Sequence, residues 1–337
     1  MSGTAPVRFG VTTMATEPPE RFRALVRAVE ESGFDDLWVC DSSLHARDAY
    51  AFLTLVATES RRLRFGPNCA HPYTRHPALT LNAMATLHEL SGGRARVAVG
   101  AGDRPVTELG YRTAPVAVVR GMLDVLRALQ RGETVDIAGP AVVRHAQLTV
   151  PLPAPLPIYV SASGPRMLAL GGEVADGVLF LPGVLPACVE FALERIRAGA
   201  ATAGRDSGAL DLGCTVAGSL RDAAEVARAE CVPMAAWFPQ TAPVYAKIAG
   251  VEPEIVAKIR AAYAGGHFDG ARKAFGYVTD EMVDRFTVAG PAELWVRRLA
   301  EVIRCGVRHI NIFLLSRDKL AMVRDLGARV LPRLKGA

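Results

Sequence analysis

The sequence alternates short apolar segments with amphipathic segments of helical period along almost its whole length. Residues 7–14 form an apolar run of strand length. The next segment places Phe22, Leu25, Val26 and Val29 at the spacing that puts them on one face of a helix. About eight such strand–helix units follow one another. Apolar strands separated by helices predict a parallel sheet covered on both faces, and eight units favour a closed (β/α)8 TIM barrel over an open sheet.

The same pattern gives the expected bounds of the elements. Strands are predicted at residues 7–14, 35–41, 63–70, 96–100, 157–162, 177–181, 210–217 and 307–315. Helices are predicted at 19–33, 49–59, 77–90, 115–131, 165–173, 185–203, 291–305 and 318–334. A hairpin is expected at 135–150, with its turn at Gly139 and Pro140. Residues 223–284 contain no clear strand, and we expect a helical insertion there within a single domain spanning 1–337.

Composition and charge narrow the class of protein. Half of the residues are hydrophobic and 22% are charged, which is enough for a large core. The net charge is only +5 and the basic residues are scattered, so a nucleic-acid partner is not expected. No apolar run reaches the roughly 18 residues that a membrane helix needs, and the first residues lack the features of a secretion signal. We therefore expect a cytoplasmic protein that is not associated with membranes.

Several kinds of site are disfavoured by spacing. The six cysteines lie at least 17 residues apart, so neither a Cys-x-x-Cys redox pair nor a short-spaced zinc site is present, and they are expected to be buried thiols. The seven histidines show no metal-binding spacing, and no metal is predicted. No Gly-x-Ser-x-Gly elbow, paired carboxylates at strand ends or Gly-x-Gly-x-x-Gly fingerprint occurs, which disfavours hydrolases, glycosidases and Rossmann domains.

In a TIM barrel the active site lies at the carboxyl ends of the strands, so the residues after each strand are the candidates. Asp41-Ser42-Ser43 follows the second strand; a helix cap or turn explains it equally well. Residues 66–77 follow the third strand, and their four glycines and prolines indicate a constrained loop. Gly66-Pro67 suggests a bulge or bend in that strand.

Two further loops complete the candidate site. Gly100-Ala101-Gly102-Asp103 follows the fourth strand, where glycines allow a flat ligand or a phosphate to approach the backbone. Residues 161–166, Ser-Ala-Ser-Gly-Pro-Arg, join a strand to a helix. The free N–H groups of that helix would suit an anion and Arg166 could add charge, although an ordinary serine cap accounts for the same residues.

Taken together, these loops resemble the luciferase-like superfamily, and within it the branch of F420-dependent (deazaflavin) oxidoreductases typified by the methylenetetrahydromethanopterin reductases. Several segments carry the resemblance in the family's order. They are residues 38–41, 71–77, 89–94, 100–103, 157–165, 175–177 and 290–291. The resemblance covers essentially the whole chain and is best over 7–182 and 287–334.

The resemblance implies a barrel with an insertion, a homodimer, and a deazaflavin or flavin lying across the strand ends. It implies a non-proline cis peptide at Asn68-Cys69, behind the ring of the cofactor. It places the cofactor's phosphate against Ser163, Gly164 and Pro165. The full set of cofactor-binding candidates is Asp41, Asn68, Cys69, Ala101, Gly102, Ser161, Ser163, Gly164, Pro165 and Arg166.

Two residues depart from the family pattern. Ser42 stands where the F420 branch usually has a histidine, and Thr12 stands where the methylenetetrahydromethanopterin reductases carry an acid. A positioned general acid contributes about 10²- to 10⁴-fold. We therefore expect another hydride acceptor or donor than the pterin. Asp103, Thr12 and Ser42 are the catalytic candidates, with Asp103 as the carboxylate that could move a proton. The expected substrate pocket adds His45, His71 and Tyr73.

The first hypothesis is an F420-dependent oxidoreductase that passes a hydride between the deazaflavin and an electron-poor C=C, C=N or C=O of a small metabolite. The second is an FMN-dependent monooxygenase that uses O2 and is supplied by a separate flavin reductase. The third is a non-catalytic relative that only binds a flavin or a metabolite. Aromatic residues of the insertion could form a lid or could simply pack beneath it. They are Trp237, Phe238, Tyr245, Tyr263 and Phe268.

Overall fold

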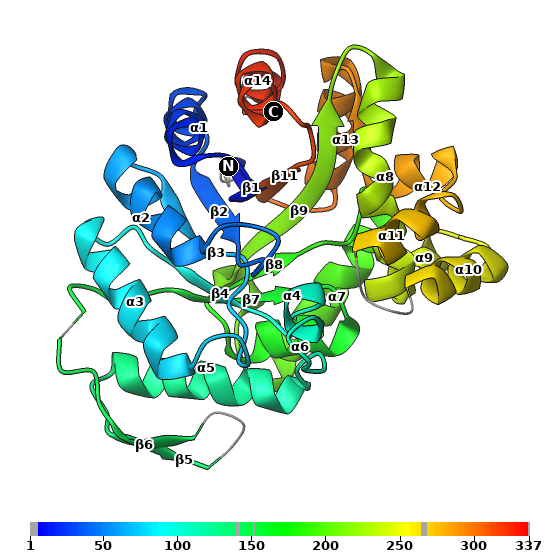
Figure 1. The fold of residues 1–337 in the computed structure, drawn as a ribbon. Helices are drawn as coiled ribbons and strands as arrows, with labels where there is room; N and C mark the ends of the chain where they lie inside the picture. Colours follow the sequence, from blue (N-terminus) through cyan, green and yellow to red (C-terminus); the bar gives the residue numbers. More distant parts are fainter. Residues whose placement is uncertain (1–5, 139–141, 151, 264–267, 336–337) are drawn as a thin grey trace.

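The computed structural model describes residues 6–138, 142–150, 152–263 and 268–335, the side chains of 268–271 excepted. Its centre is a parallel barrel whose strands follow the order β3-β2-β1-β11-β9-β8-β7-β4 (Figure 1). The barrel strands are β1 (Arg8–Met14), β2 (Asp36–Cys40), β3 (Arg64–Pro67), β4 (Val97–Val99), β7 (Ile158–Ala162), β8 (Gly177–Phe180), β9 (Asp211–Leu220) and β11 (His309–Leu314). A short strand, β10 (Val288–Gly290), pairs with β9 outside this path.

The two ends of the strand path meet at β3 and β4. Isolated parallel bridges join Phe65 to Ala95 and Ala70 to Val99. Between these bridges the ladder is interrupted, and the peptide bond Asn68-Cys69 is cis, as the resemblance implied. The expected TIM barrel is therefore confirmed. At this seam between β3 and β4 the barrel is nearly, but not completely, closed.

Helices surround the barrel. They are α1 (Pro19–Glu31), α2 (Ala49–Glu59), α3 (Pro77–Leu90), α4 (Arg104–Thr107), α5 (Val116–Gln130), α6 (Pro165–Val174), α7 (Pro186–Thr202), α13 (Ala292–Arg304), α14 (Lys319–Asp325) and α15 (Leu331–Leu334). In α1, Phe22, Leu25, Val26 and Val29 face the core, as their spacing predicted. Gly33 follows that helix with φ of 83°, a conformation that glycine adopts at low cost. Local sequence thus sets both the buried face and the end of this helix.

The segment between β9 and β10 is built from helices and lies beside these two strands (Figure 1). Its helices are α8 (Ala224–Thr241), α9 (Pro243–Ile248), α10 (Pro253–Tyr263), α11 (Phe268–Phe275) and α12 (Asp280–Phe286). The hairpin predicted at 135–150 is present as β5 (Val135–Ile137) and β6 (Val143–Ala146), which pair antiparallel. Its predicted turn at Gly139 and Pro140 lies outside the described residues.

The barrel interior changes in character along its axis. A small apolar cluster of Trp38, Ala98, Tyr159 and Leu179 fills the middle, and Cys69 packs against it. Trp38 and Tyr159 meet edge to face, with ring centroids 5.4 Å apart. This packing leaves the carboxyl ends of the strands as the open end of the barrel.

Charged side chains occupy the opposite, amino-terminal end. Arg8 lies 2.6 Å from Asp211, and Arg64 lies 2.6 Å from Asp36. His309 Nδ1 lies 3.0 Å from the Asp211 carboxylate. These residues come from β1, β2, β3, β9 and β11, so an ionic cluster joins strands across the bottom of the barrel.

Some sequence predictions need correction. The strand predicted at 63–70 ends at Pro67, because the chain leaves the ladder at Asn68 and Cys69 before it pairs again at Ala70. The strand predicted at 210–217 continues to Leu220, where it gains β10 as a neighbour. Three cysteines are buried, whereas Cys40, Cys69 and Cys305 are partly exposed, so the expectation of buried thiols is only half right.

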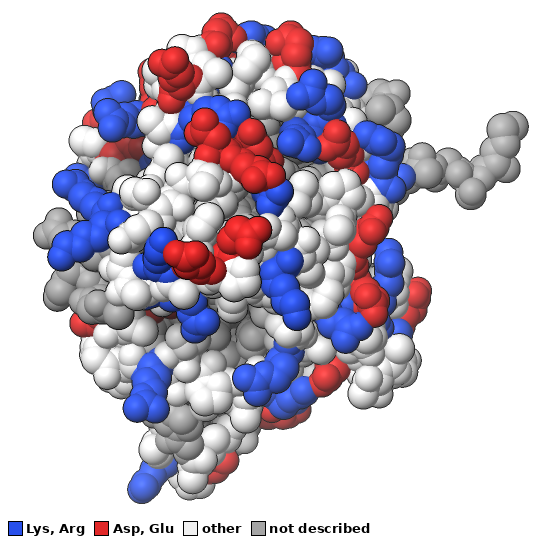
Figure 2. All heavy atoms as spheres, turned by 90° about the vertical axis from the view of Figure 1, so that its right-hand side faces the viewer, with Lys and Arg blue, Asp and Glu red and all other residues white. Residues whose placement is uncertain are grey.

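The surface shown in Figure 2 carries basic and acidic side chains interspersed with one another. Several ion pairs join exposed groups, as Arg329 and Asp222 do. Within the described ranges, no helix has both the length and the apolar character needed to cross a membrane.

Candidate active site

The predicted site residues lie at the carboxyl ends of β1, β2, β3, β4 and β7. Thr12 and Ser161 belong to β1 and β7 themselves, and the others follow their strands. One hydrogen-bonded chain links three of the predicted residues. The Thr12 hydroxyl oxygen accepts from Asn68 Nδ2 at 3.4 Å, and Asn68 Oδ1 accepts from Ser161 Oγ at 2.9 Å. Thr12 is only 1% exposed, so it lies in the barrel wall and not on an open pocket surface.

Two residues that sequence reasoning missed extend this chain. Asn311 Nδ2 donates to Thr12 at 2.6 Å and to the Thr215 hydroxyl at 3.2 Å. Asn311 is fully buried. A polar residue at every second position of a strand was the available signal, because successive side chains point to opposite faces. The chain ties β1, β7, β9 and β11 to the loop after β3.

The loops after β3 and β4 approach each other closely at Gly100. A Cβ at this position would lie 2.3 Å from Cys69 Sγ, so no larger residue fits without a shift. Burial raises the pKa of the Cys69 thiol well above its usual range. Cys69 is therefore a neutral packing group beneath the loop. Ala101, the next residue, is half-buried and its carbonyl accepts from Ala114 N at 2.9 Å.

His71 and Asp103 lie together beside Gly102. Gly102 has φ of 76°, and a Cβ there would lie 3.1 Å from His71 Cδ2. Burial lowers the pKa of His71 to about 4, although the nearby charge of Asp103 opposes this shift. His71 Nδ1 lies 3.2 Å from the Thr74 hydroxyl. At neutral pH His71 is an uncharged imidazole, in which one ring nitrogen donates a hydrogen bond and the other accepts one.

Asp41 has a different environment. Burial, with the charge of Asp48, raises the pKa of Asp41 to about 6, and the charge of Arg75 opposes the rise. The Arg75 guanidinium lies over the Tyr50 ring at 4.1 Å from its centroid. Asp41 is thus a carboxyl group that titrates close to neutrality at the end of β2. Ser42 beside it is half-buried, and its carbonyl accepts from the backbone of the following turn.

At the outer rim of the site, residues of the loops after β2 and β3 contact residues of the segment after α4. His45 Nε2 forms an ion pair with Glu108, which the sequence did not single out. Tyr73 stacks on Tyr111 with centroids 5.3 Å apart. The predicted pocket residues His45 and Tyr73 therefore have partners in the segment after α4, which brings these loops together.

The segment after β7 forms the start of α6. Gly164 is the N-cap residue and Pro165 occupies the first turn, and no side chain caps this helix. Nothing lies within 4 Å of a Cβ built on Gly164, so the space before the helix is open. Ser163 is half-buried, whereas Pro165 and Arg166 are exposed. The uncapped N–H groups can receive an anion.

The helical insertion reaches this site. Trp237 of α8 donates its indole N–H to Asp103 Oδ2 at 3.0 Å. Phe238 and Tyr245 are fully buried, so of the proposed lid aromatics these two pack within the insertion. Tyr263 is half-buried. Burial raises the pKa of Tyr263; the charge of Arg104 lowers it and the charge of Asp103 raises it. The side chain of Phe268 lies outside the described part of the chain.

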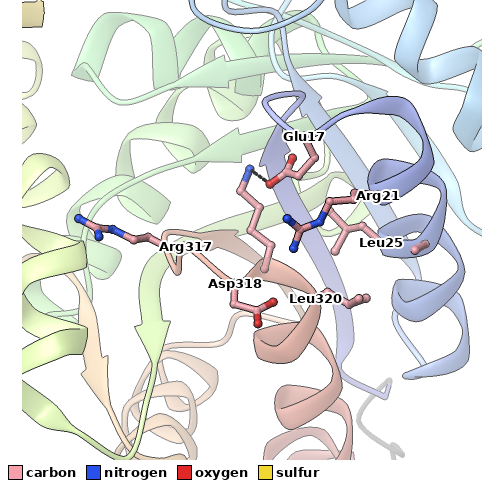
Figure 3. Close-up of a pocket in the computed structure, with 8 residues that line it drawn as sticks. Glu17, Arg21, Leu25, Arg317, Asp318 and Leu320 are labelled. Atoms are coloured by element: carbon pink, nitrogen blue, oxygen red, sulfur yellow. Dashed lines mark ion pairs between the residues drawn. The ribbon is translucent and has the colours of Figure 1, made fainter.

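A separate small pocket of about 90 Å³ lies outside the barrel between α1 and α14 (Figure 3). Arg21, Leu25 and Leu320 line it, and Lys319 reaches across to pair with Glu17 at 2.8 Å. None of the predicted site residues lines this pocket. It is a crevice between two packed helices and not part of the candidate active site.

Comparison with known proteins identifies the family of this chain. The family model of the luciferase-like monooxygenases matches residues 1–309. The 5,10-methylenetetrahydromethanopterin reductase of Archaeoglobus fulgidus is 30% identical, over 98% of this chain and 100% of the relative.

Solved structures show the same architecture. The coenzyme F420-dependent tetrahydromethanopterin reductase from Methanopyrus kandleri superimposes with a TM-score of 0.83 at 26% identity, covering 98% of this chain and 100% of that chain. An F420-dependent secondary alcohol dehydrogenase, solved with an F420–acetone adduct, has a TM-score of 0.81 at 18% identity. It covers 98% of this chain and 99% of its own, and at this identity it shows the fold alone.

Proposed function

This chain belongs to the luciferase-like monooxygenase family, and from that membership we propose that it is an F420-dependent oxidoreductase. It transfers a hydride between the deazaflavin and an electron-poor C=C, C=N or C=O of a small metabolite. The observation that carries the proposal is the full-length similarity to a reductase whose name includes coenzyme F420. The FMN-dependent monooxygenase and the non-catalytic relative remain the outcomes against which the proposal is tested.

The residues at the open end of the barrel fit a flat, phosphate-bearing cofactor. The N–H groups at the start of α6, with Ser163 and Gly164, would hold its phosphate, because no side chain caps them. The backbone at Ala101 and Gly102 and the Asn68-Cys69 peptide would face its ring. Gly100 supports this, because any side chain there would collide with Cys69 and push the two loops apart.

F420, when bound, supplies or accepts the hydride. The protein supplies orientation, exclusion of water and proton transfer. Asp103 carries a carboxylate oxygen, Oδ1, for which the structure gives no hydrogen-bond partner within its described ranges. We assign to Asp103 the proton that accompanies the hydride. His71, uncharged at neutral pH, would hydrogen-bond to the substrate without adding a charge.

The substrate is proposed to differ from the pterin of the reductases. Thr12 is held in the barrel wall by Asn311 and Asn68, and its hydroxyl cannot replace a general acid at neutral pH. Ser42 likewise carries no group that titrates near neutrality. A homodimer is part of the proposal, and light scattering of the purified protein measures it.

A binding titration with F420 and with FMN, followed by fluorescence, tests the cofactor. We expect F420 to bind at least tenfold more tightly than FMN. Preference for FMN, with oxygen consumption when reduced FMN is supplied, would establish the monooxygenase instead. Tight binding of F420 without turnover of any substrate would favour the non-catalytic relative.

Turnover is then measured with pairs of oxidised and reduced substrates. The panel contains methylenetetrahydromethanopterin, a secondary alcohol with its ketone, and unsaturated and imine metabolites. Asp103→Asn is expected to lower kcat by about 10²- to 10⁴-fold, the range of a general acid or base. Unchanged turnover at saturating substrate would remove Asp103 from the proton-transfer role.

A further inference from the structure

The carboxylate of Asp103 accepts its hydrogen bond from a distant helix and not from the helix that it begins. Asp103 is the N-cap residue of α4, where an aspartate usually accepts a hydrogen bond from the first turn of its own helix. The structure records no such side-chain cap. The carboxylate instead accepts from Trp237 Nε1 at 3.0 Å, across 134 residues of sequence.

The donor is anchored by the packing of the insertion. Trp237 meets Phe238 edge to face, with centroids 5.2 Å apart. Phe238 is fully buried, stacks on Phe286 at 4.3 Å and contacts Tyr245 at 6.3 Å. These rings come from α8, α9 and α12. The indole is therefore placed by a packed aromatic cluster and not by a mobile surface side chain.

In the contact between Trp237 and Asp103, the roles of donor and acceptor are fixed. An indole N–H only donates, so Trp237 satisfies Oδ2 and adds no acceptor that could compete for a proton. Oδ1 keeps no hydrogen-bond partner from the described chain and stays available to a ligand. In the first turn of α4, Pro105 has no N–H and the Val106 N–H donates to the Asp103 backbone carbonyl at 3.1 Å, so Trp237 is the donor that the described structure gives to the carboxylate.

We propose that Trp237 is a positioning residue, which holds the Asp103 carboxylate in one orientation so that Oδ1 faces the substrate. The inference rests on the proposed function, because it concerns how that reaction's proton is delivered. It also gives the insertion a role: α8 supplies one wall of the active site and fixes the rotamer of a residue from the β4 loop.

The contact itself is tested without any cofactor. Protein labelled with 15N at tryptophan gives indole N–H resonances from Trp38, Trp237 and Trp295, and Trp237→Phe identifies the one that belongs to Trp237. We expect Asp103→Ala to shift the Trp237 resonance and to leave the other two in place. A Trp237 resonance unchanged by Asp103→Ala would overturn the proposal whatever the activity.

The role is tested by a double-mutant cycle on hydride transfer, with the best substrate of the panel. Trp237→Phe is expected to lower kcat by about tenfold, the factor that a hydrogen bond to a charged group is worth, while the Kd for F420 changes less than twofold. In the Asp103→Ala background the same substitution should have no further effect. Additive losses would show that Trp237 acts independently of Asp103 and would overturn the proposal.

Controls separate this inference from the proposed function. Val226→Ala, at an exposed position of the same helix, should leave kcat and the Kd for F420 unchanged. Thermal unfolding of each variant checks that it folds. Wild-type protein that binds no F420 overturns the proposed function together with this inference. Wild-type protein that turns over, with an additive cycle, overturns the inference alone.

Discussion

At the scale of single residues, the surroundings of a side chain determine its behaviour in this site more than its residue type does. Asp41 and Asp103 both follow barrel strands, yet burial raises the pKa of Asp41 to about 6, whereas Asp103 has a hydrogen bond from Trp237. His71 is uncharged at neutral pH because it is buried. Three titratable side chains at the same end of the barrel therefore differ in pKa or hydrogen bonding because their surroundings differ.

His71 makes stability depend on pH. Its pKa falls from about 6.5 to about 4 on folding, so the unfolded chain binds this proton first as the pH drops. The contribution of His71 to stability is complete above pH 6.5 and is lost as the pH falls to 4, by about 3 kcal/mol at most. In His71→Gln, the unfolding free energy measured in urea should vary less across this window.

The control for that measurement is His145→Asn, because the His145 side chain is 87% exposed. It should reproduce the wild-type pH dependence between pH 6.5 and 4. If His71→Gln has the same slope as the wild type, burial of His71 does not cause the pH dependence.

Sequence reasoning identified residues beside strand ends but not their partners. The loop residues Asp41, His71 and Asp103 were predicted because parallel strands present their carboxyl ends at one edge. Glu108 and Trp237 could not be assigned as partners of His45 and Asp103, since nothing local in the sequence sets which distant side chain a carboxylate or an imidazole meets.

At the scale of elements, helices were predicted more closely than strands. The bounds of α2 and α3 match the prediction, because capping residues and proline mark helix starts. The strand predicted at 63–70 was too long, and β10 was missed. Three residues, Val-Ala-Gly, carry no periodic signal, and β10 exists because β9 offers it a free edge.

One lysine links the start of α14 to the end of β1 and the residues that follow it. Lys319, at the start of α14, donates to the Met14 carbonyl at 3.0 Å and to Thr16 Oγ1 at 2.9 Å. It also forms an ion pair with Glu17 at 2.8 Å (Figure 3). Its side chain is only 12% exposed. Lys319→Met should destabilise the protein by about 1–3 kcal/mol in denaturant unfolding, because a carbonyl and a carboxylate lose their donor.

Lys258→Met is the matched control, since Lys258 pairs with Glu254 on the surface of α10 at 50% and 79% exposure. That substitution should cost much less stability than Lys319→Met, because solvent screens the exposed pair. Equal effects of the two substitutions would mean that Lys319 is no more important than a surface lysine.

At the scale of the whole molecule, the two ends of the barrel are chemically distinct. The open end carries neutral hydrogen-bonding chains and the candidate site. The closed end carries Arg8, Asp36, Arg64, Asp211 and His309, which join strands from both halves of the chain. The barrel was predicted from its eight units, whereas this ionic cluster depends on which strands become neighbours after closure.

Asp211 is the centre of that cluster. Burial favours its neutral form, but His309 and Arg8 outweigh this and hold the pKa of Asp211 well below its usual range. Its carboxylate therefore stabilises the fold above about pH 4, and this stabilisation is lost as the pH falls further. Asp211→Asn should cost about 3 kcal/mol at pH 7, because it removes the buried charge that Arg8, His309 and Tyr159 contact.

The comparison variant is Asp222→Asn, which breaks an exposed pair with Arg329. We expect a much smaller loss of stability from it at pH 7 than from Asp211→Asn, because solvent screens an exposed pair. The difference between the two variants should shrink below pH 4. A constant difference down to pH 3 would show that the Asp211 charge is not the source of the effect.

The pairing of β1 with β11 has a consequence for synthesis on the ribosome. Translation delivers β2 soon after β1, but the other neighbour of β1, β11, lies roughly 300 residues further along the chain. At roughly 5–20 residues per second, the nascent chain carries this open strand edge for tens of seconds. Unpaired edges can recruit other strands, so we expect the edge of β1 to be a site of misassembly until translation delivers β11.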